Sequence, residues 1–67
     1  MNASQSIQVN QEMINTLVES SKEMAIRLNI SVSEAIDKKI KVFQKVSKND
    51  TEKTAWFLRG EEAKKMI

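Results

Sequence analysis

The chain has 67 residues and a mass of 7.7 kDa, which is enough for one small domain and leaves a monomer only a small core. It contains neither cysteine nor histidine, which excludes disulfides, thiolate metal sites, the usual structural zinc sites and the commonest catalytic bases and nucleophiles. We therefore expect no cofactor, no metal and no enzyme activity, and we expect self-association to stabilise the fold.

The formal net charge of +2 is unevenly distributed along the chain. Residues 35–67 carry nine lysines or arginines against five acidic residues, whereas residues 1–34 carry two against four. Lysines gathered in one stretch indicate either contact with a polyanion or the solvated face of a helix. No apolar run is long enough to span a membrane, and the N-terminus does not resemble a signal peptide, so we expect a cytoplasmic protein without a membrane partner.

Apolar and polar residues alternate near the N-terminus. Ile7, Val9 and Met13 fall on one side of an extended chain, and Ser6, Gln8, Asn10 and Glu12 fall on the other. This period of two predicts a short strand with one apolar face. The same residues can alternatively form the first turns of a helix, because asparagine, glutamine and glutamate are poor strand formers.

Two helices joined by a short connection are predicted next. Thr16 with Glu19, and Ser31 with Glu34, are each spaced as a capping box, and Asn29 is a suitable C-cap between them. The first helix has an apolar stripe, as does the second, which runs to about Ser47. The stripes are Leu17, Val18, Ser21, Met24, Ala25 and Leu28, followed by Ala35, Ile36, Ile40, Phe43 and Val46.

The C-terminal part of the chain is compatible with two structures. Trp56, Phe57 and Leu58 precede Gly60, the only glycine, so this part can be a hairpin or a short helix that ends at Gly60. The only tryptophan lies here and needs a surface against which to pack.

The predicted order of strand, helix, tight turn and helix over residues 7–46 resembles the ribbon-helix-helix (Arc/MetJ/CopG-type) family of DNA-binding proteins. The residues that carry the resemblance are Leu17-Val18, Met24-Ala25, Leu28-Asn29-Ile30-Ser31 and Glu34-Ala35-Ile36. It implies a mainly α fold with one short strand, in which two chains form an intertwined homodimer through a two-stranded antiparallel ribbon. Residues 1–48 would form this domain and residues 49–67 a C-terminal extension. The implied dimer core is Ile7, Val9, Met13, Leu17, Met24, Ala25, Leu28, Ile36, Ile40 and Phe43.

The resemblance also implies a function. The ribbon would enter the major groove of double-stranded DNA, with Gln8 and Asn10 contacting bases and Ser6 and Glu12 beside them. The start of the second helix would bind phosphate through Ser31, Val32 and Ser33, with Lys38 and Lys39 adding charge. The protein would then be a small transcriptional repressor that binds a palindromic operator as a homodimer or a higher array.

Two other functions fit the same residues. In the first, the chain is an antitoxin whose residues 49–67 fold onto a toxin protein. In the second, residues 7–28 form one helix, and the chain is an all-helical protein-binding adaptor or inhibitor of the kind that phages encode.

Overall fold

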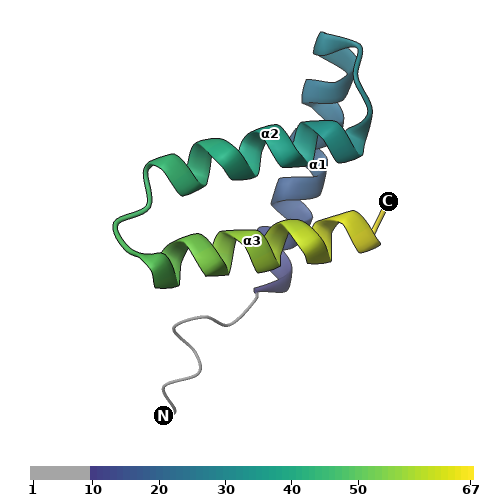
Figure 1. Cartoon of the computed structure of the whole chain (residues 1–67). Helices are drawn as coiled ribbons and strands as arrows, with labels where there is room; N and C mark the ends of the chain where they lie inside the picture. Colours follow the sequence, from purple (N-terminus) through teal and green to yellow (C-terminus); the bar gives the residue numbers. More distant parts are fainter. Residues whose placement is uncertain (1–9) are drawn as a thin grey trace.

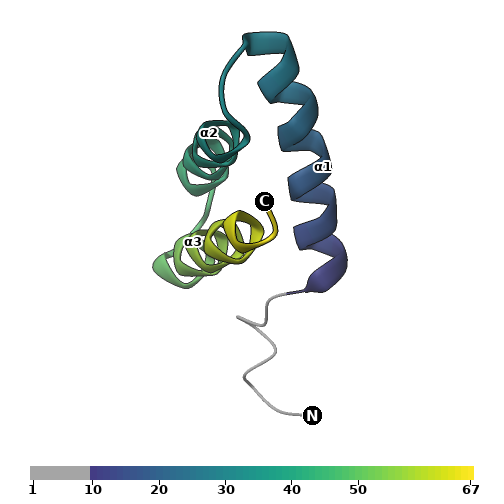
Figure 2. The same cartoon turned by 90° about the vertical axis from the view of Figure 1, so that its right-hand side faces the viewer.

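The structure, a computed structural model, describes residues 10–67, and these form three helices. They are α1 (Gln11–Leu28), α2 (Val32–Lys45) and α3 (Asp50–Lys65). Helices α2 and α3 run side by side in opposite directions, and α1 crosses both of them on one side (Figure 1). Figure 2, in which α2 and α3 are seen nearly end-on, shows that the C-terminal end of α1 projects beyond α3.

Helix α1 begins at Gln11 because Asn10 caps it. The Asn10 Oδ1 atom accepts hydrogen bonds from the backbone N–H groups of Glu12 and Met13, at 2.8 and 3.2 Å. These are two of the donors that the first turn of a helix leaves without a partner. The predicted start at the Thr16 capping box is therefore wrong, since Thr16 lies inside α1.

The reversal between α1 and α2 is confirmed at both of its caps. Asn29 ends α1 in the left-handed conformation, with φ of 57° and ψ of 49°. Ser31 then caps α2, and its Oγ atom accepts a hydrogen bond of 3.0 Å from the Glu34 N–H. Both residues have side chains that favour these cap positions, so the local sequence determines where the chain turns.

The predicted ribbon-helix-helix fold is wrong. Residues 11–13 of the expected strand are helical, no residue of 10–67 lies in a strand, and residues 6–9 of the expected strand lie outside the described residues. The physical reason is Ile14, which interrupts the alternation and begins a helical pattern. The buried residues of α1 repeat at helical spacing, and they are Ile14, Leu17, Val18, Ser21 and Ala25.

The hydrophobic core forms within a single chain. Ile14, Leu17 and Val18 of α1 meet Ile36 and Ile40 of α2 and Ala63 of α3, with Val32, Phe43 and Trp56 packed around them. Four of the residues expected in a dimer core are buried here, and they are Leu17, Ala25, Ile36 and Ile40. Met24 and Phe43 are half-buried, whereas Met13 and Leu28 are exposed. The other two, Ile7 and Val9, lie outside the described residues. Helix α3 packs against residues of α1 and α2 that were expected to face a second subunit.

Helix α3 forms the third side of this core and continues through Gly60. Asn49 caps it by accepting a hydrogen bond of 2.9 Å from the Glu52 N–H. Gly60 is buried against α2, and a Cβ atom there would lie 2.8 Å from Ile40 Cγ1. The glycine thus allows the close approach of the two helices. A toxin, the partner expected for residues 49–67 under the antitoxin hypothesis, would meet a helix that is already packed.

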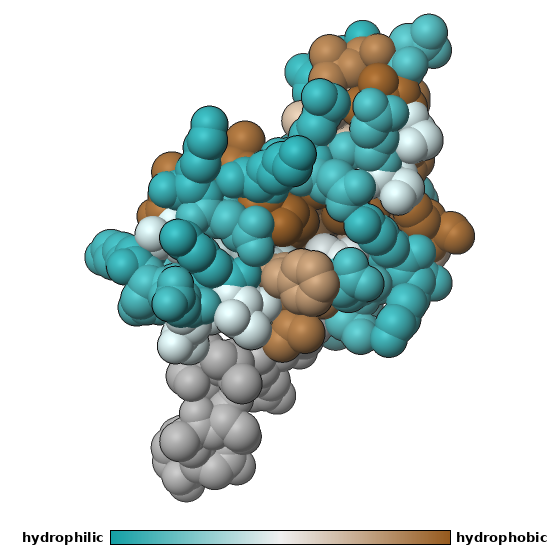
Figure 3. Space-filling view, viewed as in Figure 1, coloured by the Kyte–Doolittle hydropathy of each residue, from teal (hydrophilic) through white to brown (hydrophobic). Residues whose placement is uncertain are grey.

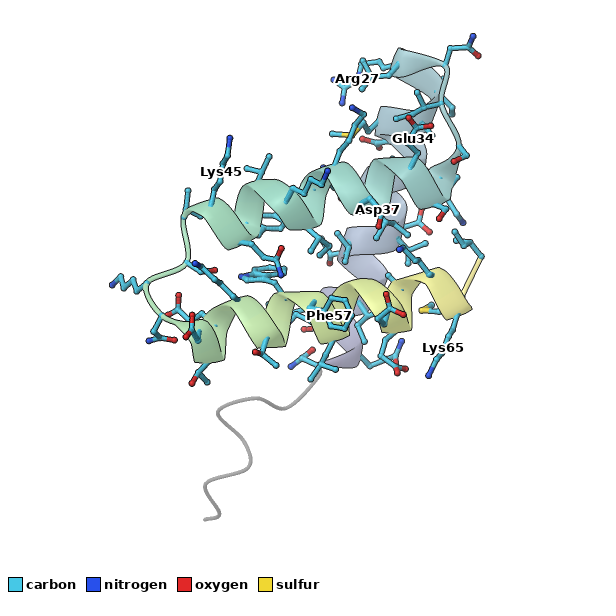
Figure 4. The ribbon with its side chains drawn as sticks, viewed as in Figure 1. Arg27, Glu34, Asp37, Lys45, Phe57 and Lys65 are labelled. Atoms are coloured by element: carbon cyan, nitrogen blue, oxygen red, sulfur yellow. The ribbon has the colours of Figure 1, made fainter. Side chains whose placement is uncertain are left out.

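Polar contacts also join α2 to α3. Asp37 points from α2 towards α3 (Figure 4), and its Oδ1 atom lies 2.6 Å from the Lys64 Nζ atom. The hydrogen bond to Asp37 raises the pKa of Lys64, burial opposes that rise, and the charges of Asp37 and Glu61 add to it. Farther along, the Gln44 side chain donates a hydrogen bond of 3.0 Å to the Lys53 carbonyl.

Within residues 10–67, no helix has the length and apolar character needed to cross a membrane.

Candidate functional site

An open and largely apolar pocket of about 300 Å³ lies where the N-terminal half of α1 meets α2 and α3. Helix α1 contributes five of its lining residues, and α2 and α3 contribute one aromatic residue each. The lining residues are Glu12, Met13, Thr16, Leu17, Ser20, Phe43 and Trp56.

The α1 wall follows from helical periodicity. Met13, Leu17 and Ser20 follow one another at steps of four and three residues, which places them on one face of the helix. Leu17 is buried, whereas Met13 is 40% exposed and can contact a bound group. The Ser20 hydroxyl donates to the Leu17 carbonyl at 3.2 Å, so its one donor is used within the helix. This wall therefore presents mainly carbon and sulfur atoms to the pocket.

The opposite wall is a pair of stacked aromatic rings. The Phe43 and Trp56 ring centroids lie 4.1 Å apart, with 15° between the ring planes. The guanidinium carbon of Arg59 lies over the Trp56 ring, 4.5 Å from its centroid, in cation–π geometry. The two rings come from different helices and together form one wall of the pocket.

Acidic residues continue from the pocket along one side of α1. Among the described residues, Glu12 is the only charged one that lines the pocket. Thr16, Glu19 and Glu23 follow it at steps of four, three and four residues. This spacing places Glu12, Glu19 and Glu23, which we call the acidic edge, along one side of α1. Glu19 lies 3.5 Å from Lys22, and both of these side chains are more than half exposed.

A second charged feature lies on the outer side of α2. Lys38, Lys41 and Lys45, which we call the lysine stripe, are exposed and share the face opposite the buried Ala35, Ile36 and Ile40. Lys45 points away from α3 in Figure 4. Within residues 10–67 no ion pair includes these three lysines. The surface that carries α2 and α3 is mostly hydrophilic, with apolar groups showing between the polar ones (Figure 3).

Two of the residues expected to contact DNA bases, Asn10 and Glu12, lie at the start of α1 among the described residues. Ser6 and Gln8 lie outside them. The Asn10 side-chain oxygen accepts the two hydrogen bonds that cap α1, and Glu12 lies in the first turn of that helix and lines the pocket.

The residues expected to contact phosphate lie at the start and middle of α2. The Ser31 hydroxyl oxygen accepts the cap hydrogen bond, Val32 packs against the core, and Ser33 is exposed. Lys38 belongs to the lysine stripe, whereas Lys39 is half-buried and lies on another side of α2. The structure thus separates the two expected lysines.

Sequence reasoning did not identify Thr16, Ser20 or Trp56 as site residues. In a helical interpretation, the spacing of Met13, Leu17 and Ser20 would have placed them on one face. No local sequence pattern indicates that Trp56 stacks on Phe43, because the two residues lie on different helices.

Within the described part of the chain, no group of three or more metal-ligating side chains gathers in one place. Comparison with models of protein families, with curated protein sequences and with solved structures finds no match.

Proposed function

We propose that the protein is a non-enzymatic, cytoplasmic protein-binding module whose pocket receives an apolar side chain of a partner protein. The observation that supports this proposal is the pocket itself, which combines an apolar α1 wall with the stacked rings of Phe43 and Trp56. Burying a leucine- or phenylalanine-sized side chain contributes about 1.5–3 kcal/mol. Apolar clefts lined by aromatic side chains are also where binding energy concentrates in protein interfaces.

The proposal is tested by site-specific photo-crosslinking in cells that express the chain. A photoreactive amino acid at Met13 places the reactive group in the pocket, and one at Ile26 serves as the matched control. Ile26 is also apolar and on α1, is 83% exposed, and does not line the pocket.

We expect a discrete protein adduct from position 13 that is absent from position 26. Adducts of equal yield at both positions, or adducts only with a second copy of this chain, would contradict a separate partner at the pocket.

The lysine stripe favours a second candidate function, which is binding of double-stranded DNA by α2. Three exposed lysines on one helical face, in a chain with a pI near 9.1, can neutralise phosphates. Such binding would weaken steeply with salt, and replacing Lys38, Lys41 and Lys45 by glutamine would lower the salt slope. A salt-independent DNA affinity, or one unchanged by the triple replacement, would contradict this function.

A further inference from the structure

We propose that the partner segment bound at the pocket is basic, with an apolar anchor residue flanked by lysine or arginine. This inference rests on the proposed protein-binding function and adds the chemistry of the partner. Its basis is Glu12, which lines the otherwise apolar pocket, together with Glu19 and Glu23 farther along the same side of α1.

The acidic edge is long enough to contact several side chains of a bound segment. Glu12 and Glu23 are separated by eleven residues of α1, which corresponds to about 16 Å along the helix axis. Glu12 lines the pocket, so a cation next to the anchor would meet it first. Glu19 and Glu23 lie about two and three helical turns beyond Glu12, so they would meet cations farther along the segment.

The carboxylates of the acidic edge are available to a partner. Glu12, Glu19 and Glu23 are all exposed. Within residues 10–67, the Lys22–Glu19 contact is the one ion pair that involves them, and exposed pairs of this kind are weak. The lysine stripe is on α2 and does not line the pocket. The three carboxylates outnumber Lys22, and Arg59 lies over Trp56 on the other wall, so the α1 side of the pocket is net acidic. Such a charge attracts a basic segment and repels an acidic one.

A second copy of the chain is a less suitable occupant. Its lysine stripe is basic, with the exposed Val42 and Val46 beside it, but the stripe and the pocket are different surfaces. A contact between two different surfaces is heterologous, and repetition of it produces open chains of molecules unless it closes into a ring. Self-association is therefore an outcome that the experiment must exclude.

The experiment compares two blocked peptides that share a phenylalanine anchor. One peptide carries lysines on both sides of the anchor, and the other carries glutamates at the same positions. Binding is followed by the fluorescence of Trp56, which lines the pocket and is the only tryptophan of the chain. Because each exposed charge pair contributes about 0.2–1 kcal/mol, three pairs predict that the lysine peptide binds about tenfold more tightly at low salt. The difference should nearly vanish at about 1 M salt, where the Debye length is about 3 Å.

A matched pair of variants assigns the preference to the pocket. Glu12→Gln removes the carboxylate that lines the pocket, and Glu34→Gln removes an exposed carboxylate from the first turn of α2. Both replacements remove a charge from the first turn of a helix, so both have similar effects on folding. We expect Glu12→Gln to reduce the lysine preference about two- to fivefold and Glu34→Gln to leave it unchanged.

The other possible results distinguish a failure of the basic partner from a failure of the pocket as a binding site. Equal affinity for the two peptides, tighter binding of the glutamate peptide, or equal effects of the two variants would overturn the basic partner while leaving the pocket a binding site. If neither peptide changes the fluorescence of Trp56, the proposed function fails together with this inference. Concentration-dependent association of the chain that the lysine peptide abolishes would identify a second copy as the occupant and would also overturn the proposal.

Discussion

The ring of Phe43 on α2 stacks on the ring of Trp56 on α3, with their centroids 4.1 Å apart. This contact joins the end of α2 to the first half of α3 and also forms one wall of the pocket. The same pair of residues thus contributes to stability and to the candidate binding surface.

Replacing Phe43 by leucine should remove the stacking while keeping an apolar side chain. Aromatic pairs contribute about 0.5–1.5 kcal/mol beyond their buried area, so we expect a loss of about 1 kcal/mol in the free energy of unfolding. Denaturant unfolding followed by Trp56 fluorescence measures this loss. Phe57→Leu is the control, because Phe57 is 53% exposed and should change stability by less than about 0.5 kcal/mol. Equal losses in the two variants would show that the stack adds no stability.

Gly60 should be intolerant of a methyl group even though alanine favours helices. A Cβ atom at this position would lie 2.8 Å from Ile40 Cγ1, so Gly60→Ala must displace Ile40 or separate α2 from α3. Overpacking costs about 1–3 kcal/mol, and the better helix propensity of alanine returns about 1 kcal/mol, so we expect a net loss of about 1 kcal/mol.

A double-mutant cycle with Ile40→Ala checks the cause of this loss. Without the Ile40 side chain, Gly60→Ala should no longer destabilise the protein and should stabilise it by up to about 1 kcal/mol. The same loss in both backgrounds would exclude the contact with Ile40 as the cause.

Several features of the fold could be predicted because they depend on neighbouring residues. The caps at Asn29 and Ser31 use side chains that bond within their own turn, so the reversal between α1 and α2 is encoded locally. The predicted start of α1, at Thr16, is wrong because Asn10 suits both a polar position of a strand and the N-cap of a helix. Ile14 resolves this ambiguity, because an apolar residue directly after Met13 breaks the alternation that a strand would show.

The pocket could not be predicted in the same way. Its aromatic wall requires Phe43 and Trp56 to meet across two helices, and that meeting depends on how closely α3 approaches α2 at Gly60. Without α3 in place, Leu17, Ile36 and Ile40 resemble a dimer core, because their helical spacing is the same whichever surface covers them. Patterns within one element identify its buried face, but they do not identify what covers that face.

Replacing Ser21 by alanine should stabilise the protein. It is completely buried, and its Oγ atom has no hydrogen-bond partner within the described residues. An unsatisfied buried polar group costs about 1–3 kcal/mol, so we expect Ser21→Ala to raise the free energy of unfolding by about 1 kcal/mol. Thermal unfolding followed by circular dichroism measures the gain. Ser20→Ala is the neighbouring control, since the Ser20 hydroxyl already donates to the Leu17 carbonyl and its removal should gain less.

The ion pair of Asp37 with Lys64 should make stability fall at alkaline pH. Asp37 raises the pKa of Lys64 in the folded chain above its ordinary value of 10.5, so the folded state holds this proton more tightly than the unfolded state. The stabilisation is therefore complete below the unfolded pKa and is lost as the pH rises through the higher pKa of the folded state. We expect Asp37→Asn to lower stability at neutral pH and to reduce the decrease between neutral and strongly alkaline pH. Lys65→Gln, which removes an exposed pair with Glu62 within α3, should leave that decrease unchanged. Denaturant unfolding at a series of pH values measures both variants, and a decrease of the same size in Asp37→Asn and in the original chain would show that another group causes it.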